Sequence, residues 1–398
     1  MLPLEHRFSL FLFKAYFTVL RKATIAMIML GLVGCSSAPE KQQQVSTSRP
    51  NEFGHQYTGN YFSRVLNRVS HVTSNKPSDY SNFADQADEV TVNSSSMDRK
   101  YGPLYRQLEK WIKTDGKVQD LTKYGIQAAQ LGGSDDRGNV MFTGYYSPVL
   151  EIRHYPDAEY KYPVYAMPKC KGRCPSRAQI YAGALKGQGL ELGYSKSMID
   201  VFMMEVQGSG FVHYGDNDEM QYFGYAGKNG HRYVSIGKVL IDRGEVPRDK
   251  MSLKAIHDWA EKQSPAKLRE LLEQNPSYVF FERRPSLDVK GSAGIPLLAD
   301  SAVAGDRKYF PMGSVILAEV PKLNEAGHWT GKHQLQLFIV LDTGGAVKRN
   351  HFDIYHGRGE KAGIAAGHYK HFGRVWKLGL KGTATQDPWL MANGQLSD

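Results

Sequence analysis

The segment QLQLFIVLDTGGAVKRNHFDIYHGRG, residues 334–359, carries one aspartate on each side of a Gly-Gly pair. Its first part, QLQLFIV, is a short apolar run that predicts a buried β-strand. Asp342 follows at the end of that strand. Gly344 and Gly345 allow the backbone to approach a ligand closely, because they carry no side chain. The segment therefore predicts a carboxylate and a glycine turn at an exposed strand end.

The second aspartate lies in the strand-like sequence HFDIYHG. Alternation with a period of two places His351, Asp353 and Tyr355 on one face, and Phe352 and Ile354 on the other. An aspartate flanked by apolar side chains loses hydration and holds its proton more tightly, which suits a general acid. The alternative is a pair of aspartates that cap turns. His351 and Asp353 as metal ligands lack a third ligand.

Strand-like sequence recurs on both sides of a helical region. It occupies residues 140–156 before that region, and SVILAEV and GRVWKLGL after it. The C-terminal strands are too few to close a sheet alone, so we expect them to pair with the earlier stretch near 140–150. This order predicts a mainly β protein with some α-helix, in which one β domain is interrupted by a second domain.

Capping residues mark the helices of the middle region. Ser235–Arg243 reads as one helix, Ser252 can cap LKAIHDWAEKQ, and Ser264-Pro265 opens AKLRELLEQ. Asn275-Pro276 ends the last of these helices.

The first 35 residues favour export. Arg21-Lys22 is followed by the short apolar run ATIAMIMLGLVG and then Cys35. LVGC looks like a bacterial lipobox, whose cysteine takes a diacylglyceryl group after export. The small residue before Cys35 and the serines after it favour this reading over a plain signal peptide with a chance cysteine. By resemblance to other lipoproteins, Ser36 in place of aspartate favours the outer membrane.

The chain that follows is first polar and then helical. Residues 36–60 are rich in Gln, Ser, Thr and Pro, which is typical of a flexible tether. Apolar residues at helical spacing predict an amphipathic helix that begins after Pro103. A second helix is predicted near residues 121–131.

Charge and cysteine content limit the functional classes. The chain has 398 residues and a net charge of +10, which suits an anionic lipid or an acidic polymer as partner. It has no run of Arg and Lys with interleaved aromatic residues, which argues against nucleic acid. Cys170 and Cys174, in KCKGRCP, form either a small disulfide hairpin or two free thiols. A lone CxxxC does not make a zinc site, and no metal or other cofactor is expected.

Two further stretches have the composition of a sugar-binding surface. FTGYYSP (142–148) and MEVQGSGFV (204–212) each join a glycine turn to hydroxyl, amide and aromatic groups. Aromatic faces cover the apolar side of a sugar ring, and the polar groups bind its hydroxyls. The alternative is ordinary tyrosine packing beside glycine turns.

The sequence FIVLDTGG also fits the active-site loop of an aspartic protease. That chemistry needs two such loops that share one proton. The chain has one DTG and no second DTG or DSG, which argues against this alternative.

Several long motifs closely resemble the membrane-bound lytic murein transglycosylase A family. They are FTGYYSP, MEVQGSGF, YAGKNGHRYVSIGKVLIDRGEVP, LLEQNPSYVFF and LDTGGAVKRNHFDIYHGRG, and the resemblance runs in order from about residue 100 to about residue 377. The region from about residue 290 resembles the three-aspartate domain of that family, whose positions match Asp306, Asp342 and Asp353. The resemblance implies a double-psi β-barrel interrupted by an inserted β domain, with a glycan groove between them.

The resemblance also implies an activity and its residues. Enzymes of this family cut the β-1,4 bond between N-acetylmuramic acid and N-acetylglucosamine in peptidoglycan without water, and they leave a 1,6-anhydro ring. Asp353 matches the catalytic aspartate, Asp342 orders the site or supports charge on the sugar, and Asp306 has a structural turn role. The residues implied for the groove are Thr143, Gly144, Tyr145, Tyr146, Gln207, Gly208, Ser209 and Gly210.

We therefore expect a lipid-anchored monomer on the periplasmic face of the outer membrane, acting in cell-wall turnover and open to partners in cell-wall synthesis or hydrolysis. A peptidoglycan-binding lipoprotein without catalysis remains the alternative. The expected domains are a lipoprotein signal peptide (1–34), a lipidated N-terminus and polar tether (35–95), a first barrel part (96–148), an inserted domain (149–282), a second barrel part (283–385) and a C-terminal tail (386–398).

Overall fold

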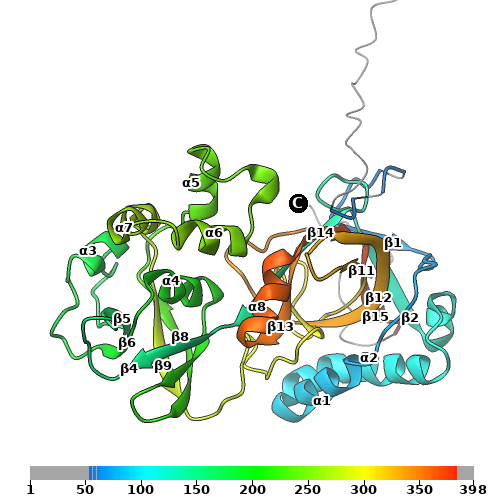
Figure 1. Cartoon of the computed structure of the whole chain (residues 1–398). Helices are drawn as coiled ribbons and strands as arrows, with labels where there is room; N and C mark the ends of the chain where they lie inside the picture. The colour runs from blue at the N-terminus through cyan, green and yellow to red at the C-terminus, as the bar shows by residue number, and fades with distance from the viewer. Residues whose placement is uncertain (1–52, 56, 60, 383–398) are drawn as a thin grey trace, which may run out of the picture. The chain divides into compact units, whose positions relative to one another are not determined.

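The computed structural model describes residues 53–382, apart from residues 56 and 60. The expected signal peptide, Cys35 and the C-terminal tail lie outside the described residues. The described residues form two β-sheets with helices packed against them, and both sheets fall within one compact unit of the chain (Figure 1).

The larger sheet has nine strands in the order β1-β2-β15-β11-β12-β10-β13-β3-β14. β13 runs parallel to β3, and β10 runs parallel to β12. The predicted pairing of C-terminal strands with the stretch near 140–150 is therefore confirmed. The strands are β1 (Leu66–Val69), β2 (Ile126–Leu131), β3 (Val140–Ser147), β10 (Ala302–Ala304), β11 (Val315–Leu323), β12 (Trp329–Asp342), β13 (His351–Arg358), β14 (Lys370–Gly373) and β15 (Val375–Leu380).

This sheet curls into a near-barrel. Its last strand, β14, approaches β11, where the backbone N–H of Glu319 donates to the carbonyl of Arg374 at 2.8 Å. Gly373 makes the approach possible, because a Cβ at that position would lie 1.8 Å from the Glu319 carbonyl oxygen.

Strands β11 and β12 are buried on both faces, which explains why their sequences read as continuous apolar runs. On one face, Leu317 and Leu337 pack in a core with the helices α1 (Phe83–Asn93) and α2 (Ser95–Lys113). On the other face, Ile316 and Phe338 pack with Phe352 of β13. Figure 1 shows the two helices alongside the sheet.

The prediction of a polar tether over residues 35–95 is wrong for residues 66–93. β1 pairs with β2, and α1 buries Phe83, Ala87 and Val90 in the core. Residues 66–93 therefore belong to the folded domain. The few buried apolar residues of this segment are spaced among many polar ones, so no clear periodicity marked it.

Of two helix predictions near this region, the first is confirmed except for its start, and the second is wrong. α2 begins at Ser95 rather than after Pro103, because Ser94 caps it by accepting the N–H of Met97, and Pro103 lies within the helix. The helix predicted at 121–131 is a 3-10 turn, η1 (Val118–Tyr124), followed by strand β2. Gly125 ends the turn with φ of 73°, and pairing with β1 and β15 then holds the next residues extended.

The chain leaves the nine-stranded sheet after β3 and returns to it at β10, so a six-stranded sheet is inserted between them. Its order is β5-β6-β4-β7-β8-β9. The strands are β4 (Val149–Arg153), β5 (Tyr162–Tyr165), β6 (Glu191–Ser195), β7 (Gly210–Tyr214), β8 (Glu219–Lys228) and β9 (Val279–Arg284). The helices are α3 (Arg177–Tyr181), α4 (Met198–Gln207), α5 (Ile236–Asp242), η2 (Arg248–Lys250), α6 (Leu253–Ala260) and α7 (Pro265–Glu273).

The predicted caps of this inserted part are confirmed. Ser235, Ser252 and Ser264 each accept a backbone N–H from the first turn of α5, α6 and α7. Sequence reasoning missed α4, because this helix is buried on most sides and shows no amphipathic period.

A disulfide joins Cys170 and Cys174, which is one of the two states that the sequence left open. Over the described residues, none of the helices combines the length and apolar character needed to cross a bilayer.

Candidate functional site

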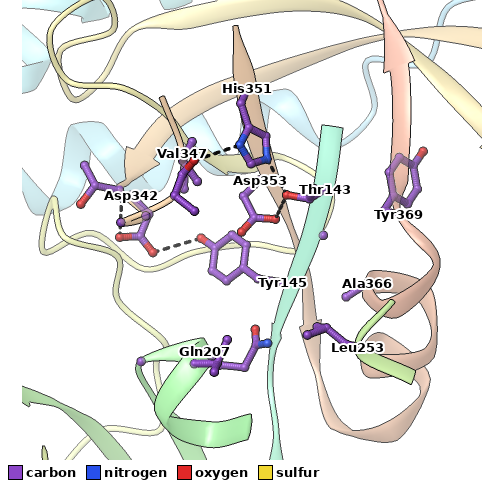
Figure 2. Close-up of a pocket in the computed structure, with 18 of the residues that line it drawn as sticks. Thr143, Tyr145, Gln207, Leu253, Asp342, Val347, His351, Asp353, Ala366 and Tyr369 are labelled. Atoms are coloured by element: carbon purple, nitrogen blue, oxygen red, sulfur yellow. Dashed lines mark hydrogen bonds between the residues drawn. The ribbon is translucent and has the colours of Figure 1, made fainter. Parts of the chain in front are cut away.

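A cavity of about 1920 Å³ takes its lining from both sheets (Figure 2). β3, the end of β12 and β13 provide its carboxyl, hydroxyl and imidazole groups. Gln207, the last residue of α4, provides an amide, and Ser209 in the turn that follows provides a hydroxyl. Leu253 of α6 and Ala366 of α8 (Gly359–His368) also line it.

Asp353 projects into this cavity from β13. Its neighbours Phe352 and Ile354 point to the opposite face and are buried in the core, as the alternation predicted. The parallel register places Thr143 of β3 directly beside it, and the Thr143 Oγ1 lies 2.7 Å from Asp353 Oδ1. Burial raises the pKa of Asp353 to about 6, while a hydrogen bond donated by Thr143 to the ionised carboxylate acts in the opposite direction.

His351 occupies the same face of β13 as Asp353. Its Nε2 lies 2.8 Å from Thr143 Oγ1, and its Nδ1 lies 3.3 Å from the carbonyl oxygen of Ala346. Burial lowers the pKa of His351. Thr143 thus contacts both the imidazole and the carboxyl (Figure 2).

Asp342 terminates β12 and accepts three hydrogen bonds. Its Oδ1 accepts the backbone N–H groups of Ser292 (2.9 Å) and Thr343 (2.8 Å), and its Oδ2 accepts the Tyr145 hydroxyl at 3.2 Å. Burial raises the pKa of Asp342, although each of these bonds favours the ionised form. Burial also raises the pKa of Tyr145, so this phenol keeps its proton and acts as a donor.

Asp306 lines the same cavity but is held within a turn. Its carboxylate accepts the backbone N–H groups of Lys308 (3.1 Å) and Arg349 (3.0 Å). Arg349 adopts a left-handed conformation with φ of 53°, which a non-glycine residue rarely takes. The Asp306 carboxylate therefore joins two turns at the rim of the cavity.

Most of the predicted groove residues line the cavity. They are Thr143, Gly144, Tyr145, Gln207, Gly208 and Ser209. Tyr146 and Gly210 lie outside this lining, although the backbone N–H of Tyr146 donates to Gln207 Oε1 at 3.1 Å.

Two of the three glycines in this set, Gly144 and Gly210, are required by close packing. A Cβ at Gly144 would lie 2.7 Å from the Cα of Ala366, so α8 could not pack against β3. A Cβ at Gly210 would lie 2.7 Å from the side chain of Met204.

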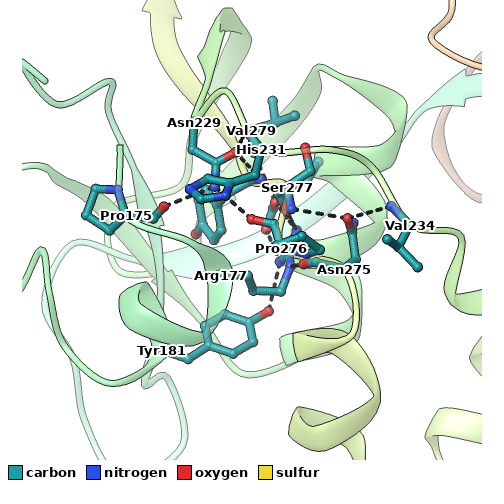
Figure 3. A network of polar contacts seen from close by, with 12 residues as sticks. Pro175, Arg177, Tyr181, Asn229, His231, Val234, Asn275, Pro276, Ser277 and Val279 are labelled. Atoms are coloured by element: carbon teal, nitrogen blue, oxygen red, sulfur yellow. Dashed lines mark hydrogen bonds and ion pairs between the residues drawn. The ribbon is translucent and has the colours of Figure 1, made fainter. Parts of the chain in front are cut away.

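A buried ion pair between Arg177 and Glu205 fixes the helix that carries Gln207. Figure 3 shows the Arg177 side chain of this pair near Tyr181, Asn275 and Ser277. Arg177 donates from its Nη atoms to both oxygens of Glu205, at 3.0 and 2.8 Å. It also donates to the carbonyls of Asn275 (3.0 Å) and Ser277 (2.6 Å). Glu205 in turn accepts the N–H of Val279 at 3.2 Å. The end of α4 is thereby tied to α3 and to the start of β9.

The sequence and its family resemblance predicted the aspartates, Thr143 and Tyr145 as site residues, but not the hydrogen bonds between them. Period-two alternation had placed His351 beside Asp353, but the bond that both make with Thr143 depends on a strand pairing between distant segments. The Tyr145–Asp342 bond and the Ser292 N–H have no local signal at all.

Among the carboxyl groups that line the cavity, Asp342 and Asp353 have pKa values raised by burial and lie beside hydroxyl, amide and aromatic groups. A carboxyl that keeps its proton near neutral pH can donate it to a leaving oxygen. Within the described residues, no three His, Cys, Asp or Glu side chains gather in a way that would hold a metal ion.

Two family models match the chain. The MltA specific insert domain matches residues 141–282, and the 3D domain matches residues 301–379. The first covers the six-stranded sheet except for the end of β9, and the second contains Asp306, Asp342 and Asp353.

Curated relatives extend this match over most of the chain. The membrane-bound lytic murein transglycosylase A of Vibrio cholerae serotype O1 is 61% identical over 343 residues, which is 86% of this chain and 93% of that protein. Its counterpart in Escherichia coli K12 is 45% identical over 333 residues, which is 83% of this chain and 91% of that protein.

Solved structures of the same family also match this chain. A crystal structure of Escherichia coli MltA with bound chitohexaose has a TM-score of 0.79 at 44% identity, and the match covers 84% of this chain and 99% of that chain. A second, described as a unique lytic transglycosylase fold, has a TM-score of 0.67 at 45% identity, with the same coverage. The predicted resemblance is confirmed: the chain belongs to the membrane-bound lytic murein transglycosylase A family, and it is an enzyme.

Proposed function

We propose that this enzyme cleaves the β-1,4 bond between N-acetylmuramic acid and N-acetylglucosamine in peptidoglycan and closes a 1,6-anhydro ring on the muramyl product. The observation that carries the proposal is the position of Asp353. This carboxyl projects from β13 into a large cavity, and burial raises its pKa to about 6. The bound chitohexaose of the Escherichia coli relative supports a glycan in the same groove.

In the first half of the reaction Asp353 is the acid. Its proton passes to the glycosidic oxygen while the bond from that oxygen to the anomeric carbon breaks. The leaving saccharide departs with a new hydroxyl group, and Asp353 becomes a carboxylate. Its raised pKa suits this step, because the carboxyl is still protonated where an ordinary aspartate is ionised.

In the second half Asp353 is the base. The muramyl 6-hydroxyl oxygen bonds to the anomeric carbon, and its proton passes to the Asp353 carboxylate. One bond has broken, one has formed, and the proton has returned. Because the nucleophile is tethered to the same sugar, its effective concentration is very high, and a second catalytic carboxylate is not required.

Asp342 supports this chemistry without exchanging the proton. Two backbone N–H groups and the Tyr145 hydroxyl hold its carboxylate in place. In its ionised form it stabilises the positive charge that develops on the sugar ring. Asp306 maintains the turns at the rim, as its two backbone contacts support.

Charge at the cavity suits an anionic polymer. Lys228, Arg248, Lys290 and Lys348 line it, and none of these four cations forms an ion pair within the described part of the chain. We assign them to the carboxylates that peptidoglycan carries on its peptide stems.

The same proposal covers the location. A lipid on Cys35 would anchor the enzyme to the periplasmic face of the outer membrane, and the following polar residues would let it reach the glycan. We further propose that the nine-stranded sheet is a double-psi β-barrel, that the protein is a monomer, and that it works in cell-wall remodelling beside other cell-wall enzymes.

Purified sacculi test the proposed reaction. We expect soluble muropeptides whose muramyl ends are lighter by one water than the products of hydrolysis, as measured by mass spectrometry. Reducing muramyl ends would show a hydrolase and overturn the ring closure. Sedimentation of the protein with sacculi, without any soluble product, would indicate a binding protein and overturn the catalysis.

A further inference from the structure

Four groups form a continuous hydrogen-bonded chain at the floor of the cavity, which we call the Thr143 relay. They are the carbonyl of Ala346, the imidazole of His351, the hydroxyl of Thr143 and the carboxyl of Asp353 (Figure 2). The Thr143 hydroxyl has one proton to donate and two neighbours that can accept it. The direction of each bond is therefore coupled to the others.

The carbonyl of Ala346 fixes one end of this chain. A carbonyl oxygen only accepts, so His351 Nδ1 must carry a proton to make the 3.3 Å contact. In a neutral imidazole Nε2 is then an acceptor. Neutral His351 is the form that its burial favours, because burial lowers its pKa. His351 Nε2 therefore competes with the Asp353 carboxylate as acceptor for the Thr143 hydroxyl proton, and we take the arrangement in which Thr143 donates to Nε2.

The other end of the chain follows from this assignment. Once the Thr143 proton is given to His351, the Thr143 oxygen has only lone pairs to offer Asp353. The 2.7 Å contact is then a hydrogen bond only if Asp353 carries the proton and donates it. With Asp353 protonated, every donor in the relay has an acceptor. With Asp353 ionised and His351 neutral, one contact is left without a proton.

We propose that His351 is a positioning residue that keeps Asp353 in its acid form by drawing the Thr143 hydroxyl proton away from the carboxylate. This inference rests on the proposed role of Asp353 as the acid and base. After Asp353 has protonated the leaving oxygen, the Thr143 hydroxyl can donate its one proton either to His351 or to the new carboxylate, but not to both. Recovery of a proton from the 6-hydroxyl completes the relay again, so the relay favours the second half of the reaction as well.

Other titratable groups also lie near Asp353, and the charged ones among them influence its pKa independently of the relay. The charge of Asp342 raises the pKa of Asp353, and a positive charge on His356 of β13 lowers it. Tyr145 of β3 stays a neutral phenol. Lys370 of β14, the register partner of Thr143, lines the same cavity. All of them remain in place when His351 is replaced.

His351→Phe tests the relay through the pH profile. Without the imidazole, Thr143 donates to the carboxylate at all times, and a donor to the charged form lowers the pKa of Asp353. We expect the alkaline fall of kcat/KM to move to lower pH by about 1 unit. His351→Gln, whose amide oxygen can accept from Thr143, should leave that fall near its wild-type position. A uniform loss of activity at every pH, with the fall unmoved, would show a merely structural role and overturn the proposal.

Thr143→Val provides the control, because the proposed effect passes through the hydroxyl. In that background the substitution of His351 by Phe should no longer shift the profile. An equal shift with and without the hydroxyl would also overturn the relay.

Nitrogen-15 NMR of histidine-labelled wild-type enzyme tests the assignment even if a variant fails to fold. At neutral pH, where an ordinary imidazole is already mostly neutral and burial lowers the pKa of His351 further, His351 should carry its proton on Nδ1, and Nε2 should be unprotonated. A neutral His351 with its proton on Nε2 would contradict the relay. This readout is independent of turnover. An active Asp353→Asn enzyme would therefore overturn the proposed reaction without affecting the histidine assignment. A neutral His351 protonated on Nε2 would overturn the relay without affecting the proposed reaction.

Discussion

Asp353→Asn is expected to lower the rate of muropeptide release from sacculi by about 10²–10⁴-fold. Asparagine keeps the size and hydrogen-bonding shape of the carboxyl but cannot donate a proton to the leaving oxygen or take one from the 6-hydroxyl. Binding of the variant to sacculi, measured by co-sedimentation, should remain close to that of the wild type. Turnover at the wild-type rate would remove Asp353 from the mechanism.

Asp306→Asn is the matched control. Asp306 lines the same cavity, but its oxygens accept backbone N–H groups, and the amide oxygen of asparagine can still accept one of them. We expect this variant to keep most of the activity. A loss of activity as large as that of Asp353→Asn would show that both aspartates are equally required, contrary to the roles proposed here.

The same Asp353→Asn substitution should stabilise the folded protein. Burial raises the pKa of Asp353 from its ordinary value of 3.8 to about 6, so the folded state holds the proton more tightly than the unfolded state does. The resulting stabilisation is complete below about pH 4 and is lost as the pH rises to about 6. At pH 7.5 the neutral amide should raise the free energy of unfolding by about 3 kcal/mol. A variant less stable than the wild type at this pH would contradict the burial argument.

Arg177→Met is expected to lower the free energy of unfolding of the inserted part by about 3–5 kcal/mol. The side chains of Arg177 and Glu205 are 1% and 2% exposed, so the substitution leaves a carboxylate buried without its cation. It also removes the donors to the carbonyls of Asn275 and Ser277. Urea denaturation measures the loss. Because Glu205 precedes Gln207 on α4, we also expect weaker glycan binding.

Arg243→Met is the matched control for this prediction. Arg243 also binds both oxygens of a glutamate, Glu270, but these side chains are 31% and 50% exposed. Exposed pairs contribute about 0.2–1 kcal/mol. Glu205→Met added to Arg177→Met should recover part of the stability, because it removes the unpaired buried charge. Equal costs for Arg177→Met and Arg243→Met would show that burial does not govern the pair.

Some parts of the fold could be predicted because they have local causes. The apolar run of β12, the alternation in HFDIYHG and the serine caps of α5, α6 and α7 depend on neighbouring residues, and the structure confirms them. The order of strand-like and helical stretches also predicted one β domain interrupted by a second, and the structure has a second sheet inserted between β3 and β10.

Other parts depend on contacts between distant residues and could not be predicted. The segment 126–131 has helical spacing, yet pairing with β1 and β15 makes it a strand. The contact of Thr143 with Asp353 requires β3 and β13 to lie in parallel register, and no short-range pattern specifies a register. The sequence therefore predicted which residues gather at the site better than it predicted which hydrogen bonds they form.

The central claim is that one carboxyl, Asp353, acts in its protonated form and recovers its proton at the end of the reaction. Carbon-13 NMR of aspartate-labelled enzyme, titrated beside kcat/KM on soluble glycan strands, tests it most directly. We predict that the Asp353 carboxyl titrates near pH 6 and that kcat/KM falls over the same interval as the pH rises. An Asp353 carboxyl that is ionised throughout the pH range of full activity would contradict the account.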